Sequence, residues 1–473
     1  MHSEQLTDRR QGRPWRATLV GVVGVAIIAA SAVTGAAVAT TTPAHASVRL
    51  TAKAPSEPYQ PVLGPLFNDP LDPAHARVIN SQIRRTIAHV PKGQQIRVFS
   101  WNINSAVFEN ALINAHERGV SVRILMSNGL AEGQSDQGSY NTLKHALSLH
   151  QKSRMSTQKS WVRTCVNSCR GRGGAAHSKF FLFSKVGDLT DVAIVGSPNL
   201  TQAAALNQWN DVITFTNRPA LFETFNNVFV QASRDQLVMP PFVEATEGDL
   251  SGWFTPYTAD PEDDPVLKLL NDVQCAGATG GTGVKGYTKV RIAADTMVGN
   301  RGLRIAERIR ALHNHGCNIK LLYTTVGTRI GRLLFDKSGK GPVRAEHYVQ
   351  DLNDDDVYDN YLHMKSIAIA GHVGPKTNAL VVLNGSNNWS DFGAASDDAG
   401  LIVTRSSIVR RYLDWMDHLW ETRPPYAGDG DPDTLATRPM ARPVGGSATA
   451  DGWGPNHEVY DASTAWKYRN IEQ

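Results

Sequence analysis

Two His-x-Lys tripeptides are the residues best placed to do chemistry. His177 with Lys179, and His363 with Lys365, each open an apolar stretch that is typical of a buried strand. Side chains two residues apart on a strand point to the same face, so each tripeptide presents an imidazole beside an ammonium group. A third copy begins at His150 in a polar stretch with no such strand behind it, and we assign it to the surface.

Each of the two stretches is followed by a second apolar strand that ends in Gly-Ser-x-Asn. These motifs supply Ser197 and Asn199 in the first half, and Ser386 and Asn388 in the second. The glycine before each serine lets a ligand approach the backbone closely. Hydroxyl and amide donors, two lysines and two imidazoles together suit a phosphate group, with the imidazoles available for attack and proton transfer. Because lysines can neutralise the developing charge, we predict no metal and no other cofactor.

The elements that must position these residues also occur twice. Each half reads helix, strand, helix and strand before its His-x-Lys stretch, at a near-constant offset of about 190 residues. Asp72-Pro73 and Asp264-Pro265 stand where the first helix of each half is expected to begin. Strands that alternate with helices predict an α/β fold. We therefore predict two similar α/β lobes from an internal duplication, residues 47–250 and 251–425, each a mostly parallel sheet flanked by helices.

The two ends of the chain differ in composition from the rest. Residues 1–46 begin with a basic stretch, continue through an apolar run and end in the small-x-small pattern Ala44-His45-Ala46, which is the order of a secretory signal peptide. We predict cleavage after Ala46 and secretion. An uncleaved membrane anchor is the alternative, because the apolar run is long enough to span a bilayer. Residues 426–473 are rich in Pro and Gly and predict a loosely packed tail.

Four cysteines follow the predicted signal peptide. An even number in an exported protein favours disulfides, and nearest-neighbour pairing suggests Cys165–Cys169 and Cys275–Cys317. The other connectivities stay open. A zinc site is the competing interpretation, although Cys165 and Cys169 lack a second close pair at ligand spacing. A net charge of only +4 gives no support for a dedicated nucleic-acid surface.

The paired motifs resemble the phospholipase D superfamily, whose members carry two His-x-Lys motifs, each followed by an apolar strand and Gly-Ser-x-Asn. The resemblance extends over nearly the whole mature chain, because the repeated α/β lobes match as well. It implies a two-step reaction in which His177 is the nucleophile that forms a phosphohistidine and His363 is the general acid and base. It also implies a carboxylate behind each histidine ring. Asp211 and Asp398 are the candidates, and ordinary strand-start or turn aspartates are the alternative.

The sequence departs from the family pattern at two positions. The family has an Asp five residues after each motif lysine, where this chain has Ser184 and Ala370. That Asp is generally structural in the family, so its loss does not exclude activity. Arg170 and Arg172, shortly before His177, are candidates for a contact to a phosphate or headgroup, and a solvated loop is the alternative.

These observations together predict a secreted phospholipase D that hydrolyses phospholipids to phosphatidic acid and a free headgroup, with transfer of the phosphatidyl group to alcohols as a related reaction. A secreted nuclease or another phosphodiesterase with the same histidines is the second candidate. A non-catalytic protein that keeps the phosphate pocket is the third. We expect transient contact with a membrane surface, and a monomer, because two lobes of one chain can complete the site.

Overall fold

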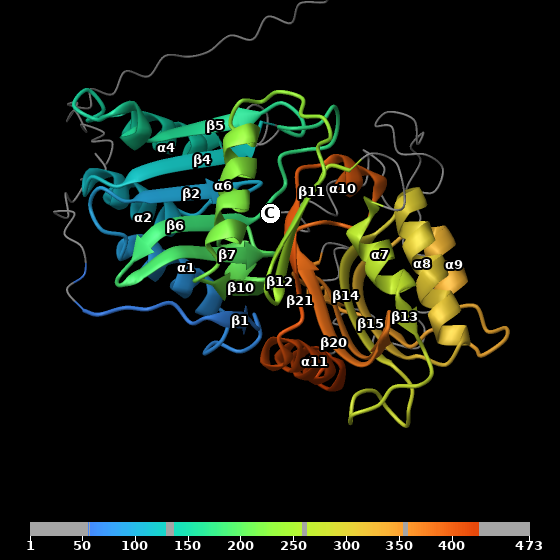
Figure 1. Ribbon diagram of the computed structural model, residues 1–473. Helices are drawn as coiled ribbons and strands as arrows, with labels where there is room; N and C mark the ends of the chain where they lie inside the picture. Colours follow the sequence, from blue (N-terminus) through green and yellow to red (C-terminus); the bar gives the residue numbers. More distant parts are fainter. Residues whose placement is uncertain (1–54, 56, 129–136, 258–262, 353–357, 425–473) are drawn as a thin grey trace, which may run out of the picture. The chain divides into compact units, whose positions relative to one another are not determined.

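The first half of the chain forms a seven-stranded sheet with helices on both faces (Figure 1). The computed structural model describes residues 55, 57–128, 137–257, 263–352 and 358–424. In sheet order the strands are β1 (Gly64–Phe67), β10 (Asp211–Phe215), β7 (Leu189–Gly196), β6 (Phe180–Val186), β2 (Gln95–Phe99), β4 (Ser121–Ser127) and β5 (Trp161–Cys165). The helices of this half are α1 (Val78–Ala88), α2 (Ala106–Glu117), α4 (Gln137–Ser148), the short α5 (Ala203–Leu206), α6 (Pro219–Ala232) and a 3-10 turn, Ser156–Gln158.

The second half forms a nine-stranded sheet of related order. Its strands are β11 (Val243–Glu247), β12 (Leu250–Phe254), β21 (Ala399–Val403), β20 (Lys376–Gly385), β19 (Lys365–Val373), β14 (Lys289–Met297), β15 (Asn318–Val326) and β16 (Ala345–His347), with β13 (Val273–Gln274) also paired to β19. Its helices are α7 (Pro265–Asn271), α8 (Gly299–Asn314), α9 (Thr328–Leu334), α10 (Asp391–Ala395) and α11 (Ser406–Glu421). Because β11 belongs to this sheet, the sheet begins before the predicted lobe boundary at residue 251. The division into two lobes itself stays a prediction.

Two small sheets complete the described secondary structure. One joins β17 (Val349–Gln350), β18 (Asn360–Leu362) and β9 (Gln208–Trp209), and so connects the two halves. The other joins β3 (Ile103–Asn104) and β8 (Leu200–Thr201). The predicted signal peptide, residues 1–46, and the predicted tail, residues 426–473, lie outside the described residues. Within the described ranges, none of the helices has both the length and the apolar composition needed to cross a bilayer.

The prediction of mostly parallel sheets is wrong, because both large sheets are mixed. The pairs β2–β4, β4–β5, β14–β15 and β15–β16 are parallel, and the other pairs of the two large sheets are antiparallel. A strand, a crossover helix and a strand give a parallel pair, as with β2, α2 and β4. The His-x-Lys strand and the strand after it are instead joined by a tight turn, which makes them antiparallel neighbours.

The turns of these two hairpins depend on glycine. Two residues separate β6 from β7, and two separate β19 from β20. Gly187 and Gly374 occupy these turns with φ of 55° and 53°, in the left-handed region that glycine adopts without steric cost. Both hairpins thereby bring the beginning of a His-x-Lys strand next to the end of a Gly-Ser-x-Asn strand.

Only one of the two predicted Asp-Pro helix starts is correct. Asp264 caps α7, since its Oδ1 accepts hydrogen bonds from the backbone N–H of Val266 at 3.0 Å and of Leu267 at 3.5 Å. Asp72 instead lies in a separate turn, where its carbonyl accepts from the backbone of Ala76, and α1 begins only at Val78. The residues after Asp72 therefore form a separate turn instead of extending α1 toward the N-terminus.

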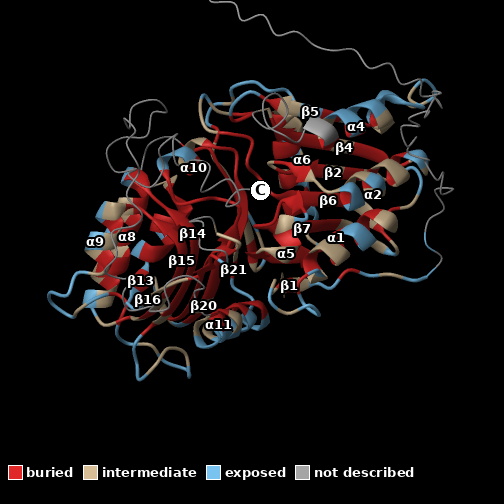
Figure 2. Cartoon of the chain, turned by 180° about the vertical axis from the view of Figure 1, so that it is seen from behind, coloured by how far each residue is buried: buried red, intermediate tan, exposed pale blue. Residues whose placement is uncertain are grey.

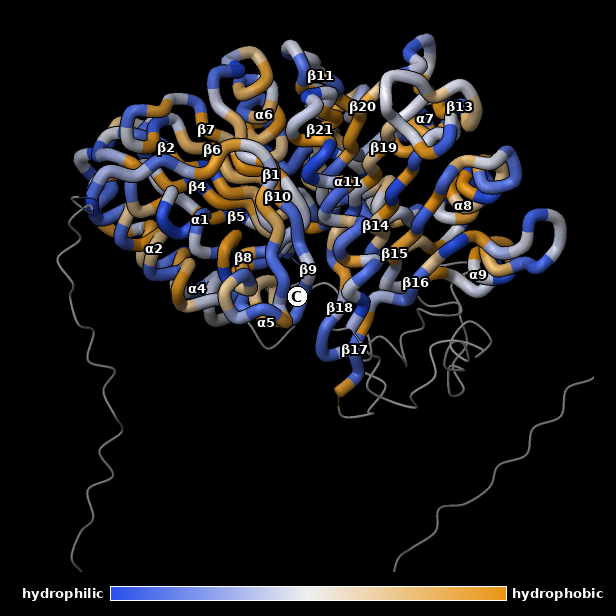
Figure 3. The backbone as a smooth tube through the Cα atoms, turned by 90° about the horizontal axis from the view of Figure 1, so that it is seen from below, coloured by the Kyte–Doolittle hydropathy of each residue, from blue (hydrophilic) through white to orange (hydrophobic). Residues whose placement is uncertain are grey.

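Successive side chains of β6 and β19, the strands that follow the His-x-Lys motifs, point to opposite faces of their sheets and so divide the interior into layers. Leu182 of β6 faces a central core, while its neighbour Phe181 faces the layer formed with α1 and α2. Ala368 of β19 faces the same central core, while its neighbour Ile367 packs with α7 and α8. Figure 2 shows the strands of both sheets buried, and Figure 3 shows hydrophobic stretches along β6, β7 and β20. The two halves therefore share a central core, and each also packs a core of its own between its sheet and its helices.

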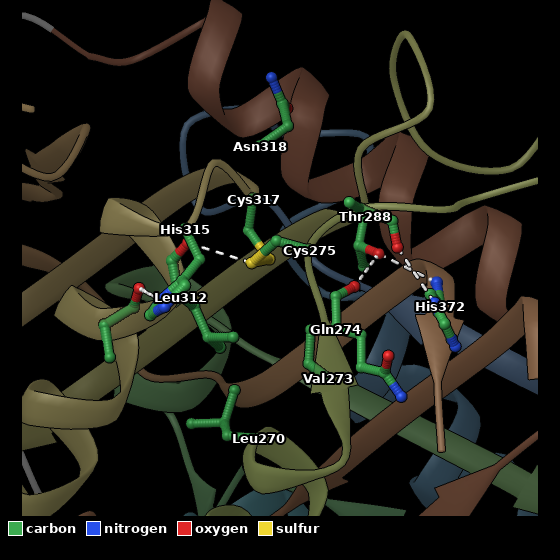
Figure 4. The surroundings of a disulfide bond; sticks show 12 residues. Leu270, Val273, Gln274, Cys275, Thr288, Leu312, His315, Cys317, Asn318 and His372 are labelled. Carbon is green, nitrogen blue, oxygen red and sulfur yellow. Dashed lines mark hydrogen bonds between the residues drawn. A yellow bond between two sulfur atoms is a disulfide. The ribbon is translucent and has the colours of Figure 1, made fainter. Parts of the chain in front are cut away.

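Both predicted disulfides are present, which confirms the nearest-neighbour pairing. Cys165–Cys169 closes a short loop directly after β5. Cys275–Cys317 joins the residue after β13 to the residue before β15. Cys275 Sγ lies 3.1 Å from the carbonyl oxygen of Leu312, near the end of α8 (Figure 4). The second disulfide therefore links β13 to β15 beside the end of α8.

Removing the two disulfides separately should destabilise the protein to different extents. The Cys275–Cys317 bond closes a separation of 42 residues and the Cys165–Cys169 bond one of 4. Loop-closure entropy then predicts a loss of about 4 kcal/mol for the paired Cys275→Ser and Cys317→Ser substitutions, and about 2 kcal/mol for Cys165→Ser with Cys169→Ser. Equilibrium urea unfolding of the two double variants checks this order. An equal or reversed loss would contradict it.

Candidate active site

The two hairpins place both pairs of motifs at corresponding strand ends. His177 and Lys179 directly precede β6, and the backbone N–H of Gly196, at the end of β7, donates to the Lys179 carbonyl at 3.2 Å. In the second half, Lys365 is the first residue of β19, and Gly385 is the last residue of β20. The predicted site residues therefore gather at one end of each sheet, as the spacing required.

The ring of His177 is held by a residue from the other half. Its Nδ1 lies 2.9 Å from Oδ1 of Asp398, which directly precedes β21, and both side chains are buried. Burial raises the pKa of the Asp398 carboxyl, but the charge and hydrogen bond of His177 and the charge of Lys179 outweigh burial and bring it below its usual value. Asp398 is therefore an anion at neutral pH and lies where the family resemblance requires a carboxylate.

The ring of His363 is also held from the other half, but by an uncharged group. Its Nδ1 lies 2.8 Å from Oδ1 of Asn210, directly before β10. His363 is completely buried. Burial is the main cause that lowers the pKa of His363 well below 6.5, and the positive charges of Lys365, Lys179 and His177 lower it further.

The backbone of each motif histidine also forms a hydrogen bond to the opposite half. The backbone N–H of His177 donates to the carbonyl of Asp397 at 2.9 Å, and that of His363 donates to the carbonyl of Trp209 at 3.0 Å. Each acceptor is the residue immediately before the ring partner of the same histidine. Two parallel bridges, Ala176 with Asp397 and β18 with β9, carry these contacts. Each histidine is thus fixed by both its backbone and its ring to the opposite half.

The two lysines differ in their surroundings. Lys179 Nζ and Lys365 Nζ each donate to the carbonyl of the histidine two residues earlier, at 2.7 Å. Lys365 Nζ also lies 2.9 Å from Oδ2 of Asp295, a buried carboxylate that sequence reasoning missed. By the strand register, Asp295 corresponds to Trp101 in the first half, whose ring lies edge-on to His177 at 5.9 Å. The second half therefore has the carboxylate of Asp295 at the position where the first half has the indole ring of Trp101.

The motif serines contact the groups that hold the histidine rings. Ser197 Oγ donates to Oδ1 of Asn210 at 2.8 Å, and Ser386 Oγ donates to Oδ1 of Asp398 at 2.5 Å. Both serines therefore help to orient the ring partners. A direct contact of Ser197, Ser386 or the two buried motif asparagines, Asn199 and Asn388, with phosphate stays a prediction.

Asp211 does not occupy the position predicted for it, because Asn210 does. Neighbouring residues at a strand end point to opposite sides. The Oδ2 of Asp211 therefore faces the second sheet and accepts from Tyr412 Oη at 2.6 Å, Asn384 Nδ2 at 3.1 Å and Ser366 Oγ at 3.2 Å. Burial raises the pKa of this carboxyl. Asn210 lies two residues before Val212, the partner of Gly196, just as Asp398 lies two residues before Gly400, the partner of Gly385. Asp211 is therefore one residue away from the position equivalent to Asp398.

A buried ionic network supports Asp398 and was not predicted from the sequence. Arg301 Nε and Nη2 bind the Asp264 carboxylate at 2.8 and 3.1 Å, and Arg301 also donates to the Asn387 side chain and, at 2.7 Å, to the Asn388 carbonyl. Asn387 Nδ2 in turn donates to Asp398 Oδ2 at 3.0 Å. Asp264, the cap of α7, and Asp398, the ring partner of His177, therefore belong to one hydrogen-bond network.

The arginines near Cys169 divide into two kinds. Arg170 is buried and donates to the backbone carbonyls of Pro241 and Thr255, so it is neither a solvated residue nor, in this arrangement, available to a phosphate. Arg172 is exposed. The Asp397 carboxylate accepts from the backbone N–H of Cys169, and burial, against the opposing charge of Arg170, raises the pKa of Asp397 to about 7. Among the described residues no group of three or more His, Cys, Asp or Glu could hold a metal ion.

Asp211→Asn and Asp398→Asn should change stability with opposite dependence on pH. The folded-state pKa of Asp211 is raised, so the unfolded chain loses its proton first and the wild type loses stability as pH rises from about 4. We expect the unfolding free energy of Asp211→Asn, relative to the wild type, to increase between pH 4 and pH 8, as measured by urea unfolding.

The Asp398→Asn variant is the matched control. Because the folded-state pKa of Asp398 is lowered, its stabilising effect is complete above the unfolded pKa and is lost as pH falls through the folded pKa. We expect a loss of about 1–3 kcal/mol at pH 7, typical of a charged buried hydrogen bond, and a smaller loss toward pH 3. The same pH trend in both variants would contradict the positions assigned to these carboxylates.

Comparisons with known proteins agree with the motifs of the first half. Residues 84–232 match the family model described as cardiolipin synthase, PLD-like domain. This range includes His177, Lys179, Ser197 and Asn210. No curated protein matches the chain at a significant level.

Three solved structures are similar over part or most of the chain. Polyphosphate kinase from Porphyromonas gingivalis has a TM-score of 0.48 and 11% identity over 75% of this chain, which spans 49% of that protein. Phosphatidylserine synthase from Haemophilus influenzae Rd KW20 has a TM-score of 0.47 and 12% identity, covering 80% of this chain and 93% of that one. The phospholipase D family member Nuc from Salmonella typhimurium has a TM-score of 0.27 and 20% identity, covering 37% and 96%. These structural likenesses are too weak to carry an argument about activity. The matched family model shows that residues 84–232 contain a PLD-like, phosphodiesterase-type domain.

Proposed function

We propose that this protein is a secreted phospholipase D-type phosphodiesterase that hydrolyses phospholipid headgroup esters to phosphatidic acid through a phosphohistidine. The observation that carries the proposal is the state of the two motif histidines. Each Nδ1 is held by an acceptor from the other half, whereas each Nε2 is buried without a hydrogen-bond partner among the described residues. A buried nitrogen that is left without a partner costs free energy, and a bound substrate would satisfy it.

In the first step, the lone pair of His177 Nε2 attacks phosphorus and forms the N–P bond. The bond from phosphorus to the headgroup oxygen breaks, and its electron pair goes to that oxygen, which takes a proton from His363 Nε2. The ring of His177 becomes positively charged, and the carboxylate of Asp398 stabilises this charge. The ammonium groups of Lys179 and Lys365 neutralise charge on the other phosphoryl oxygens.

In the second step, His363 accepts a proton from a water molecule, whose oxygen attacks phosphorus. The N–P bond breaks, its electron pair returns to His177 Nε2, and phosphatidic acid is released. An alcohol that takes the place of the water would yield a new phosphatidyl ester by the same transfer. Every proton moves between His363 and an oxygen of the substrate or nucleophile, so this route needs no other acid or base.

The positions where the family Asp is lost support an active enzyme rather than a non-catalytic relative. Ser184 Oγ donates to Gln94 Oε1 at 2.8 Å and accepts from the backbone N–H of Gln95 at 2.9 Å, at the far end of β6 from His177. Ala370 pairs with Lys289 within the second sheet. Neither position contributes a contact to a histidine ring, so their change leaves the two histidines with their partners.

Two adjoining loops favour a lipid surface over a nucleic acid as the partner. Val166, Leu237 and Met239, which we name the apolar loop pair, are 71%, 46% and 68% exposed. The loops are joined by hydrogen bonds from the Val166 backbone to the Asp235 carboxylate and from the Val238 N–H to the Arg170 carbonyl. Exposed apolar side chains close together can insert into the interfacial region of a bilayer, whereas polyanions require a basic surface.

The predicted export supports the same environment. Two disulfides are typical of proteins that fold in an oxidising compartment. The signal peptide proposed for residues 1–46 lies outside the described residues, and secretion rests on its sequence pattern. N-terminal sequencing of protein recovered from the culture medium tests cleavage after Ala46.

His177→Ala should abolish release of choline from phosphatidylcholine vesicles. Loss of the nucleophile should reduce the rate by about three orders of magnitude or more, and a chelator should not affect the wild type. His150→Asn is the matched control, because His150 opens the exposed third His-x-Lys and should leave the rate unchanged. Cutting of plasmid DNA without choline release would replace the lipase by a nuclease, and no turnover of either substrate would favour the non-catalytic alternative.

Val166→Ser with Met239→Ser should weaken activity at the membrane without damaging the chemistry. Loss of two inserting apolar side chains should reduce vesicle binding and raise the apparent KM for vesicles by about tenfold. The rate on a soluble short-chain phosphodiester should not change. Leu149→Ser is the control, because Leu149 is exposed but lies outside the apolar loop pair. An equal effect of all these substitutions on vesicle binding would contradict a specific membrane contact.

A further inference from the structure

Asn210 and Asp398 occupy equivalent positions in the duplicated fold. Gly196 pairs with Val212 in the first sheet, and Gly385 pairs with Gly400 in the second. Each ring partner lies two residues before the paired position, so Asn210 corresponds to Asp398 by register. The contacts agree, because the distances to histidine Nδ1 are 2.8 and 2.9 Å. The duplication therefore keeps the geometry of the two contacts and changes only the charge of the acceptor.

The orientation of the Asn210 amide follows from its other contacts. Its Nδ2 donates to the Ala204 carbonyl at 3.0 Å and to Gln208 Oε1 at 3.2 Å, while its Oδ1 accepts from Ser197 Oγ at 2.8 Å. The oxygen therefore faces His363, and the hydrogen of the neutral ring lies on Nδ1. The lone pair of His363 is consequently on Nε2, the nitrogen without a partner among the described residues.

The charges around His363 are mostly positive. Burial is the largest cause that lowers the pKa of His363, and Lys365 from its own half, Lys179 from the first half and His177 lower it further. The carboxylate of Asp295 is paired with Lys365 at 2.9 Å and partly offsets that lysine. The Tyr361 ring lies edge-on at 6.1 Å. Asp398 binds His177 rather than His363, and the Nδ1 of His363 is held by the amide oxygen of Asn210 rather than by a carboxylate.

We propose that Asn210 is a positioning residue that reserves His363 for proton transfer, because its uncharged oxygen fixes the ring without stabilising the imidazolium form. The proposal rests on the phosphodiesterase function proposed above. Binding of an anionic phosphodiester supplies the negative charge that Asn210 lacks, and His363 becomes protonated on Nε2 in the complex. That proton passes to the leaving oxygen as its bond to phosphorus breaks. A carboxylate in place of Asn210 would hold the proton on His363 and make it a weaker acid.

The different roles of His177 and His363 follow from the different charges of their ring partners, Asp398 and Asn210. His177 must carry a positive charge on its ring while phosphorus is bonded to Nε2, and Asp398 stabilises that state. His363 must instead gain and lose a proton in each cycle. An amide partner suits a group whose charge is temporary, whereas a carboxylate suits a group whose positive charge must last through the intermediate.

The test is the pH profile of Asn210→Asp. An anion at this position should move the basic limb of the kcat profile upward by about one to three pH units and lower kcat below that limb. A residue with only a structural role would lower kcat equally at every pH and leave the limb in place, which would overturn the proposal. Asp398→Asn is the matched control, because it should lower kcat without moving this limb upward.

NMR titration of the His363 ring makes the test independent of turnover. The ring should titrate about one to three units higher in Asn210→Asp than in the wild type, with thermal unfolding used to confirm that the variant is folded. An unchanged titration would overturn the inference even if the enzyme hydrolyses phosphatidylcholine. A raised titration in a protein that hydrolyses no diester would overturn the proposed function and leave the electrostatic role of Asn210 in place.

Discussion

The site depends on a reciprocal exchange of hydrogen bonds between the two halves of the chain. Each motif histidine donates its backbone N–H to one residue of the opposite half and binds the next residue of that half with its ring. Sliding one sheet against the other would break both contacts of both histidines together, and each lost buried contact costs about 1–3 kcal/mol. The shared central core, to which strands of both sheets contribute, supplies the rigid packing that keeps the exchange in register.

Electrostatics at this interface is strong because water is excluded. The His177–Asp398 contact is buried, and so are the ion pairs Arg301–Asp264 and Lys365–Asp295, in which each charge has an opposite charge beside it. The hydrogen bonds of Asp211 come from hydroxyl and amide donors rather than from a cation, and burial raises the pKa of its carboxyl. The groups beside each carboxyl therefore explain why the pKa of Asp211 is raised and the pKa of Asp398 is lowered.

The duplication keeps geometry more strictly than it keeps charge. The hairpin, the strand pairing and the distance to histidine Nδ1 are alike in both halves, whereas the acceptor is Asp398 in one and Asn210 in the other. This combination suits the two-step transfer that we propose, in which two imidazoles approach one phosphorus atom and perform different tasks. The equivalent strand ends position the two imidazoles in the same way, and the different charges of Asp398 and Asn210 allow the two rings to perform different tasks.

Several local features could be predicted from the sequence. Two His-x-Lys strands and two Gly-Ser-x-Asn strands follow from residue types and spacing along the chain, since each is a local pattern, and the two disulfides match the nearest-neighbour pairing of the cysteines. Features that depend on contacts between distant segments could not be predicted: the antiparallel neighbours in the sheets, the support of Asp398 by Arg301, and Asn210 in the place predicted for Asp211. Adjacent residues at a strand end point to opposite sides, so a shift of one residue in register exchanges a ring partner for a buried structural carboxyl. Only the packed sheets fix that register.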